Sequence, residues 1–161
     1  MGEDEGHEER LDRELIELLN ELRVALPGVQ VLFAFLLTVP FTQRFGALTS
    51  LQRDVFFAAF LLTGIASVLL MAPTAYHRIR WRQYDKERML RTSNVLAISG
   101  VATLGLALAG AVFLIADLLF HAAGGAVIAG AFAGFLAWFW FGLPLSRRIG
   151  DDGGEGGGPR T

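Results

Sequence analysis

The fold is decided by residues 95–116, which read VLAISGVATLGLALAGAVFLIA and contain no charged side chain. A helix rises about 1.5 Å per residue, so a stretch of this length spans about 33 Å. The hydrocarbon core of a bilayer is about 30 Å thick, and about 20 consecutive apolar residues are enough to cross it. We therefore predict that residues 95–116 form a transmembrane helix.

Three further runs of the same kind occur along the chain. With their polar ends included, the four predicted spans occupy about residues 29–45, 55–73, 95–117 and 125–144. Apolar residues make up 53% of the 161-residue chain, and its mean hydropathy is +0.45. Sustained apolar runs are typical of membrane proteins. The sequence predicts an all-α membrane protein with a four-helix transmembrane domain over residues 27–146.

The segments outside this domain are polar. Residues 1–10 are acidic and residues 147–161 are rich in glycine and acids, so both are predicted to be disordered tails. Between residues 11 and 26, leucines at helical spacing alternate with acids, which predicts an amphipathic cytoplasmic helix. Pro27–Gly28 is expected to end this helix, and Pro40 to kink the first span.

Local polar residues are assigned to helix ends and helix backbones. Thr49 and Gln52 have the spacing of a capping box before the second span, which is expected to stop near Pro73. Hydroxyl groups within the spans are expected to bond to the helix carbonyl one turn earlier.

Positive charge is distributed unevenly between the predicted loops. The amino-terminal segment has three Lys or Arg residues, the 74–94 loop six and the carboxy-terminal tail three, whereas the opposite side has only Arg44 and Arg53. Loops rich in Lys and Arg remain in the cytoplasm. We therefore predict that both termini and the 74–94 loop are cytoplasmic.

Ionisable residues near the predicted spans are few, and none lies near the middle of a span. Asp117 and His121 are four residues apart at the outer end of the third span, and Arg44 lies at a similar depth. A histidine beside a carboxylate can titrate near neutrality, so these residues form a candidate proton or cation cluster. The alternative is that they are interfacial residues exposed to water and headgroups.

The 74–94 loop has two interpretations. Its basic residues are a candidate site for anionic lipid, or they only set the topology. A nucleic-acid role is not expected, because membrane proteins commonly contain such loops. The residues concerned are Arg78, Arg80, Arg82, Lys86, Arg88 and Arg91.

Small residues indicate where helices approach closely. Gly130 and Gly134 form a G-x-x-x-G stripe in the fourth span, and Gly105 lies in the third. Such stripes pack helices within one chain, or they form the face of a homo-oligomer. Both interpretations stay open.

Chemical signatures of an enzyme are missing from the sequence. The chain has no cysteine, and no nucleophile–base pair or cluster of metal ligands converges in any run. We expect no enzymatic activity, no cofactor and no metal site.

Two stretches resemble a known family: NELRVALPGVQVLFAFLLTVPFTQRF at residues 20–45 and APTAYHR at residues 72–78. The family comprises small four-span membrane proteins of unknown function from high-GC Gram-positive bacteria, and the resemblance covers about residues 11–120. It implies a multi-pass protein of the bacterial cytoplasmic membrane. Some members are automatically labelled sodium:proton antiporter, which would imply a small subunit of a cation transporter.

Within these stretches, polar residues near the cytoplasmic boundary are the best candidates for a role beyond folding. Glu21 is predicted to pair with Arg78 and to clamp the amphipathic helix to the end of the second span. The candidate clamp comprises Glu21, Arg23, Tyr76, His77 and Arg78. A structural or regulatory protein whose cytoplasmic face engages a partner or lipid is the favoured function, with the transporter subunit as the alternative.

Overall fold

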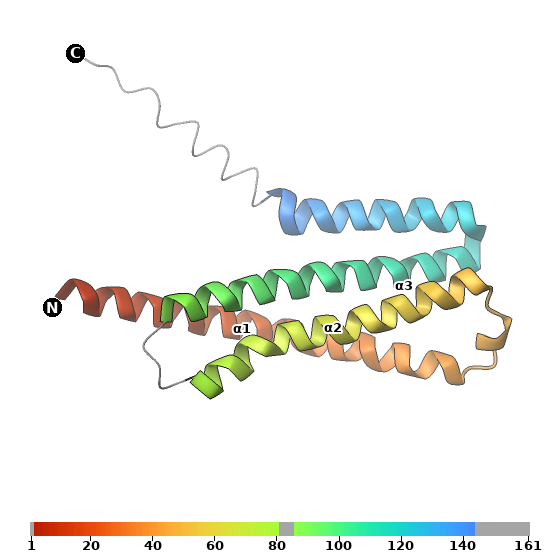
Figure 1. Ribbon diagram of the computed structural model, residues 1–161. Helices are drawn as coiled ribbons and strands as arrows, with labels where there is room; N and C mark the ends of the chain where they lie inside the picture. Colours follow the sequence, from red (N-terminus) through yellow and green to blue (C-terminus); the bar gives the residue numbers. More distant parts are fainter. Residues whose placement is uncertain (1, 81–85, 144–161) are drawn as a thin grey trace, which may run out of the picture. The chain divides into compact units, whose positions relative to one another are not determined.

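The computed structural model describes residues 2–80 and 86–143, and within them the chain is helical with no strand (Figure 1). Short helical turns follow the first long helix, and a π-helical turn follows the last. The elements are α1 (Gly2–Thr38), η1 (Val39–Phe41), η2 (Phe45–Ala47), α2 (Ser50–Arg80), α3 (Lys86–Ala137) and η3 (Trp138–Gly142).

Four segments of the described chain are long and apolar enough to cross a membrane. They are Arg13–Phe41, Ser50–Ala75, Arg88–Phe120 and Ala123–Gly142. Each overlaps one of the four predicted spans, so the all-helical architecture with four candidate membrane-spanning segments is confirmed.

The chain divides into two compact units, Met1–Leu108 and Ala109–Thr161. The first contains α1, α2 and the beginning of α3, and the second contains the rest of α3 and η3.

The helices of the first unit are packed through heptad-spaced positions. The spacing is seven residues in α1 and α3, and alternately three and four residues in α2, which is the pattern of coiled-coil seams. The buried residues at these positions are Leu15, Leu22, Val29 and Leu36 in α1, Phe56, Ala59, Thr63, Ala66, Leu70 and Pro73 in α2, and Ser93, Gly100 and Ala107 in α3.

A close helix contact in this unit joins α2 to α3. Leu22 and Val29 of α1 and Leu70 of α2 form the central apolar cluster. A Cβ atom added to Gly100 would lie 2.8 Å from Leu70 Cγ and 3.3 Å from Leu69 Cβ. Only glycine lets the α3 backbone come this close to α2.

Helix α1 corrects one expectation. It begins at Gly2 and passes through Pro27 without a break, so residues 11–26 do not form a helix separate from the first apolar segment. Proline costs about 3 kcal/mol inside a helix in water. Here Leu22 and Val29, on either side of Pro27, are anchored in the same core, and this packing outweighs the local preference. At the start of the helix, acidic residues suit the helix dipole.

The other two prolines also behave differently from expectation. Helix α1 ends at Thr38, and Pro40 lies in the η1 turn instead of kinking a longer span. Helix α2 continues through the fully buried Pro73 to Arg80. Pro73 lies three residues after the buried Leu70 and continues the buried series of α2, so its own packing favours the helix over a stop at this point.

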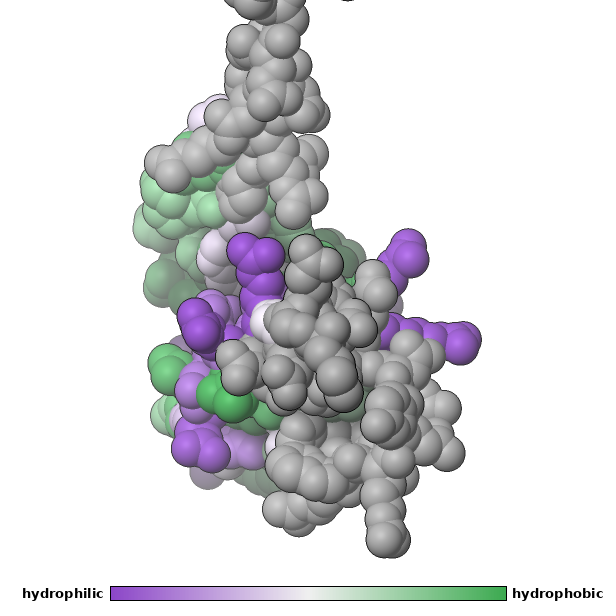
Figure 2. Space-filling view, turned by 90° about the vertical axis from the view of Figure 1, so that its left-hand side faces the viewer, coloured by the Kyte–Doolittle hydropathy of each residue, from purple (hydrophilic) through white to green (hydrophobic). Residues whose placement is uncertain are grey.

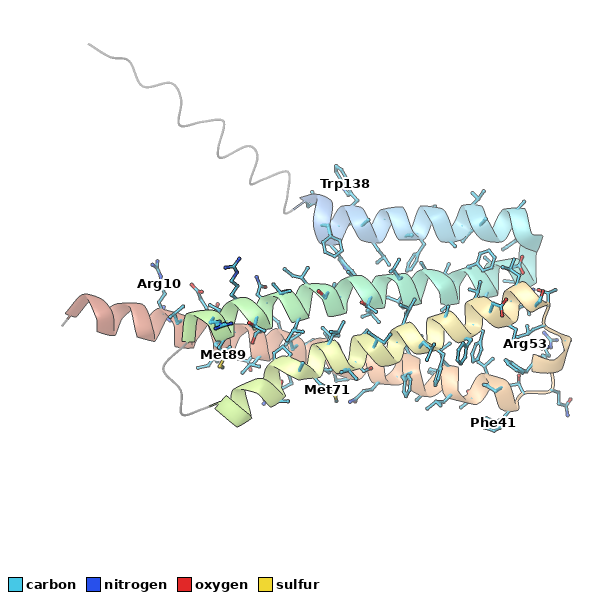
Figure 3. All side chains as sticks on the ribbon, viewed as in Figure 1. Arg10, Phe41, Arg53, Met71, Met89 and Trp138 are labelled. Atoms are coloured by element: carbon cyan, nitrogen blue, oxygen red, sulfur yellow. The ribbon has the colours of Figure 1, made fainter. Side chains whose placement is uncertain are left out.

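The turn between α1 and α2 confirms the predicted capping box. The Thr49 N–H donates to Gln52 Oε1 at 2.9 Å, and the Gln52 N–H donates to Thr49 Oγ1 at 3.2 Å. Arg53 stacks over the Phe45 ring at 5.9 Å. Figure 3 shows Phe41 and Arg53 at the end of these helices opposite to Arg10 and Met89.

Hydroxyl groups bond along their own helices, as expected. The buried Thr63 donates to the Ala59 carbonyl at 2.7 Å, and Ser67 donates to the Thr63 carbonyl at 2.9 Å. The same arrangement joins Thr103 to Ser99 at 2.7 Å.

The second unit is a helical hairpin in which the chain turns back sharply after Phe120 (Figure 1). A Cβ atom added to Gly125 would lie 2.9 Å from the Asp117 Cα, so the two arms meet backbone to backbone. Gly125 and Ala129 are buried. The apolar segment Ala123–Gly142 therefore has these two small residues, one turn apart, on its buried face.

Candidate functional site

A groove lies between the amino-terminal part of α1 and the beginning of α3. It has a volume of about 510 Å³. Figure 2 views the molecule from the end at which both helices begin and shows hydrophilic side chains beside hydrophobic ones there. The groove is lined by Leu11, Glu14, Glu17, Leu18 and Glu21 of α1 and by Leu90, Arg91 and Asn94 of α3.

The charged lining of the groove is predominantly acidic. Glu14, Glu17 and Glu21 occur at spacings of three and four residues, so they follow one face of α1. Arg91 contributes one positive charge, which leaves the lining with an excess of negative charge. These side chains are exposed, and within the described part of the chain no ion pair engages them.

The apolar lining comes from three leucines. Leu11, Leu18 and Leu90 are half-buried, and Leu18 also packs against the central cluster of the first unit. Because Leu15 and Leu22 on the neighbouring stripe of α1 are buried, the helix is fixed with its acids turned towards the groove. The groove is therefore a built feature of the packing between helices.

The arrangement of the carboxylates suits a ligand with several cationic groups better than a single metal ion. Among the described residues, no group of three or more His, Asp or Glu side chains is placed to hold a metal ion. Carboxylates that follow a helix face one turn apart instead match cationic groups with a similar spacing. The leucines between them would contact apolar parts of the same ligand.

The residues of the candidate cation cluster belong to both compact units. Arg44 is exposed and precedes η2 in the first unit, whereas Asp117 is half-buried in the second. Asp117 packs closely against Gly125. The side chain of His121 lies outside the described ones, so the cluster remains a prediction.

The candidate lipid-binding residues are described only in part. Arg78 and Arg80 belong to the last turn of α2 and Lys86 begins α3, but their side chains are not among those described. Arg82 lies outside the described residues altogether. The remaining two, Arg88 and Arg91, are exposed on the first turns of α3.

The candidate interface clamp is also incompletely described. Glu21 and Arg23 are exposed on α1, while the side chains of Tyr76, His77 and Arg78 are not described. Glu21 lines the groove together with Arg91. The pairing of Glu21 with Arg78 remains a prediction.

The glycine stripe at Gly130 and Gly134 contacts no other helix closely among the described residues. A Cβ atom added to Gly130 or Gly134 would have no neighbour within 4 Å, so neither residue is needed for a close helix contact there. Gly105 is half-buried in α3. Close approach occurs instead at Gly100 and Gly125.

The groove itself was not predicted from the sequence. The acids of α1 were recognised as the polar face of a helix, but their position opposite Arg91 and Asn94 depends on how α1 and α3 are aligned. The available signal was the heptad series Leu15, Leu22 and Val29, which runs through Pro27 and indicates one rigid helix.

Comparison with known proteins identifies a family without assigning an activity. No curated protein and no solved structure matches the chain. One family model matches residues 4–144, which include the groove and all four apolar segments. The chain therefore belongs to DUF6328, a family of unknown function.

Proposed function

We propose that this chain is a multi-pass protein of the bacterial cytoplasmic membrane with a structural or regulatory role. It crosses the bilayer four times, its termini are cytoplasmic, and its cytoplasmic face engages a partner or lipid. It is not an enzyme. The observation that supports the proposal best is the outward exposure of large apolar side chains along the four apolar segments.

This exposure fits lipid as the surrounding solvent. Val24 of α1 is 81% exposed, Val68 of α2 is 68% exposed and Val127 of α3 is 72% exposed. Water-soluble monomers rarely expose contiguous apolar surface on this scale. In a bilayer the same side chains contact acyl chains, while the heptad-spaced positions remain for contacts between helices.

The distribution of charge supports the proposed orientation. Twelve of the fourteen Lys and Arg residues lie before residue 29, between residues 74 and 94, or after residue 144. The positive-inside rule assigns these three segments to the cytoplasm. The groove, with Glu21 and Arg91 in its lining, then lies on the cytoplasmic side.

The topology is tested by cysteine labelling, for which this cysteine-free chain is well suited. Gly46→Cys and Ala123→Cys are expected to react with a membrane-impermeant maleimide in intact spheroplasts. Lys86→Cys is expected to react only after the membrane is opened. Labelling of Lys86→Cys in sealed spheroplasts, or recovery of the chain in the supernatant without detergent, would refute the proposal.

Contact with anionic lipid is tested by native mass spectrometry of the detergent-solubilised chain. The wild type is expected to retain phosphatidylglycerol in preference to phosphatidylcholine. The double variant Arg80→Gln, Arg88→Gln should lose this preference, because each basic residue near an anionic surface contributes about 1 kcal/mol. The matched control is Arg10→Gln, Arg13→Gln, which removes the same charge from α1. Equal losses in both variants would exclude a lipid site at the 74–94 loop.

A further inference from the structure

We propose that the groove between α1 and α3 is the docking site for a cationic amphipathic helix of a partner protein. This inference rests on the proposed function, because it requires the groove to face the cytoplasm. It adds the location of the binding surface and the chemistry of the partner. The occupant has Lys or Arg on one side and large apolar residues beside them.

Charge complementarity determines the sign of the charge on the partner's binding face. Glu14, Glu17 and Glu21 outnumber Arg91, and within the described chain none of the four forms an ion pair. A helix with basic residues three and four positions apart would place positive charge along this acidic row. Arg91 and Asn94 on the opposite wall would accommodate an acidic or polar side chain of the same helix.

The leucines of the lining determine the shape of the partner. A groove between two helices with apolar residues along it accepts the apolar side of a third helix through residues at i, i+3, i+4 and i+7. Leu11 and Leu18 on one wall and Leu90 on the other provide this apolar contact. The lining of α1 extends from Leu11 to Glu21, about 15 Å of helix, which matches between two and three turns of a partner helix.

The position of the groove relative to the bilayer favours a polypeptide over a lipid headgroup. A span of about 20 residues that ends at Phe41 begins near Leu22, so Glu21 lies at the hydrocarbon boundary. Glu14 then lies about 10 Å further out. The headgroup layer on each side is about 5 to 7 Å thick. The outer half of the groove therefore lies in water, beyond the reach of a headgroup.

The proposal is tested with the full chain in nanodiscs of phosphatidylcholine, which has no net charge. The probe is a fluorescein-labelled helical peptide of leucine and lysine, about 14 residues or four turns long. A second peptide has glutamate in place of lysine. Binding is followed by fluorescence anisotropy, with empty nanodiscs as the baseline.

A matched pair of variants separates the groove from general charge. Glu14→Gln, Glu17→Gln, Glu21→Gln removes the acids of the groove. The control, Glu3→Gln, Glu5→Gln, Glu8→Gln, removes the same charge from the same helix outside the lining. The groove variant should weaken binding of the lysine peptide about tenfold, as expected for the loss of several partly exposed ion pairs, while the control changes it by less than about twofold. Circular dichroism confirms that both variants keep the wild-type helicity.

Several outcomes would overturn the docking site. Equal weakening in both variants would show attraction by net charge alone, and equal binding to empty nanodiscs would show attraction to lipid alone. Equal binding of the glutamate peptide would exclude charge complementarity. If the groove variant binds the lysine peptide normally but changes the retained lipid or the oligomeric state, the groove belongs to a headgroup or to a second copy. None of these results alters the cysteine-labelling pattern, so the proposed topology is tested separately.

Discussion

Gly100 of α3 faces Leu70 of α2 at a distance that leaves no room for a side chain. A Cβ atom at position 100 would lie 2.8 Å from both Cγ and Cδ2 of Leu70. Leu70 is fully buried in the central cluster, so it has little freedom to move aside. This contact fixes how closely α2 and α3 approach each other, and it thereby helps to place the start of α3 beside α1.

Replacement of this glycine is expected to destabilise the helix packing. Gly100→Ala should lower the free energy of unfolding by about 1 to 3 kcal/mol, the usual cost of overpacking a core. Gly130→Ala is the control, because an added Cβ there meets nothing within 4 Å and alanine favours the helix. The free energy of unfolding of both variants is measured in detergent micelles by titration with sodium dodecyl sulfate. A stable Gly100→Ala variant would contradict the close contact.

Features of this fold that depend on residues close in sequence can be predicted from the sequence, whereas those that depend on contacts between distant helices cannot. The apolar runs and the capping box at Thr49 and Gln52 involve neighbours in sequence, and both are confirmed. The break at Pro27 was predicted from a local preference and is wrong. Burial of Leu22 and Val29 in one core decides the outcome, and that burial depends on α2 and α3.

The groove illustrates the same limit at the level of a site. Each of its acids was visible as part of a polar helix face, but their proximity to Arg91 and Asn94 is set by the alignment of α1 with α3. That alignment depends on contacts such as the one between Gly100 and Leu70. Close contacts are made at Gly100 and Gly125, whereas Gly130 and Gly134 make none in the described structure.

The buried stripe of α1 predicts different effects for the same substitution on two faces of one helix. Val29→Ala should lower the free energy of unfolding by about 2 kcal/mol, because it removes packed atoms from a core position. Val24→Ala, at a position that is 81% exposed, should change it by less than about 0.5 kcal/mol. Titration with sodium dodecyl sulfate in micelles compares the free energies of unfolding of the two variants. Equal effects would show that α1 is not packed through the heptad series.

The different burial of Pro27 in α1 and Pro73 in α2 predicts different effects when each is replaced by alanine. Pro27 is exposed, so Pro27→Ala should restore a helix hydrogen bond without loss of packing and raise the melting temperature. Pro73 is fully buried, so Pro73→Ala also leaves a cavity that offsets the gained hydrogen bond. Thermal unfolding followed by circular dichroism measures both. A lower melting temperature for Pro27→Ala would indicate that the proline is required for the shape of α1.

Ser93 provides a prediction of increased stability. Its Oγ is buried and has no hydrogen-bond partner among the described residues, whereas the Ser67 hydroxyl bonds to the Thr63 carbonyl. A buried polar group without a partner costs about 1 to 3 kcal/mol, so Ser93→Ala should raise the free energy of unfolding by about 1 kcal/mol. Ser67→Ala is the control, and it should leave stability unchanged or slightly lower, because it removes a hydrogen bond that is made. Both are compared with wild type by titration in micelles. If Ser93→Ala is instead the more destabilising of the two, the Ser93 hydroxyl is bonded in the membrane, and the packing of the first turns of α3 beside the groove depends on that bond.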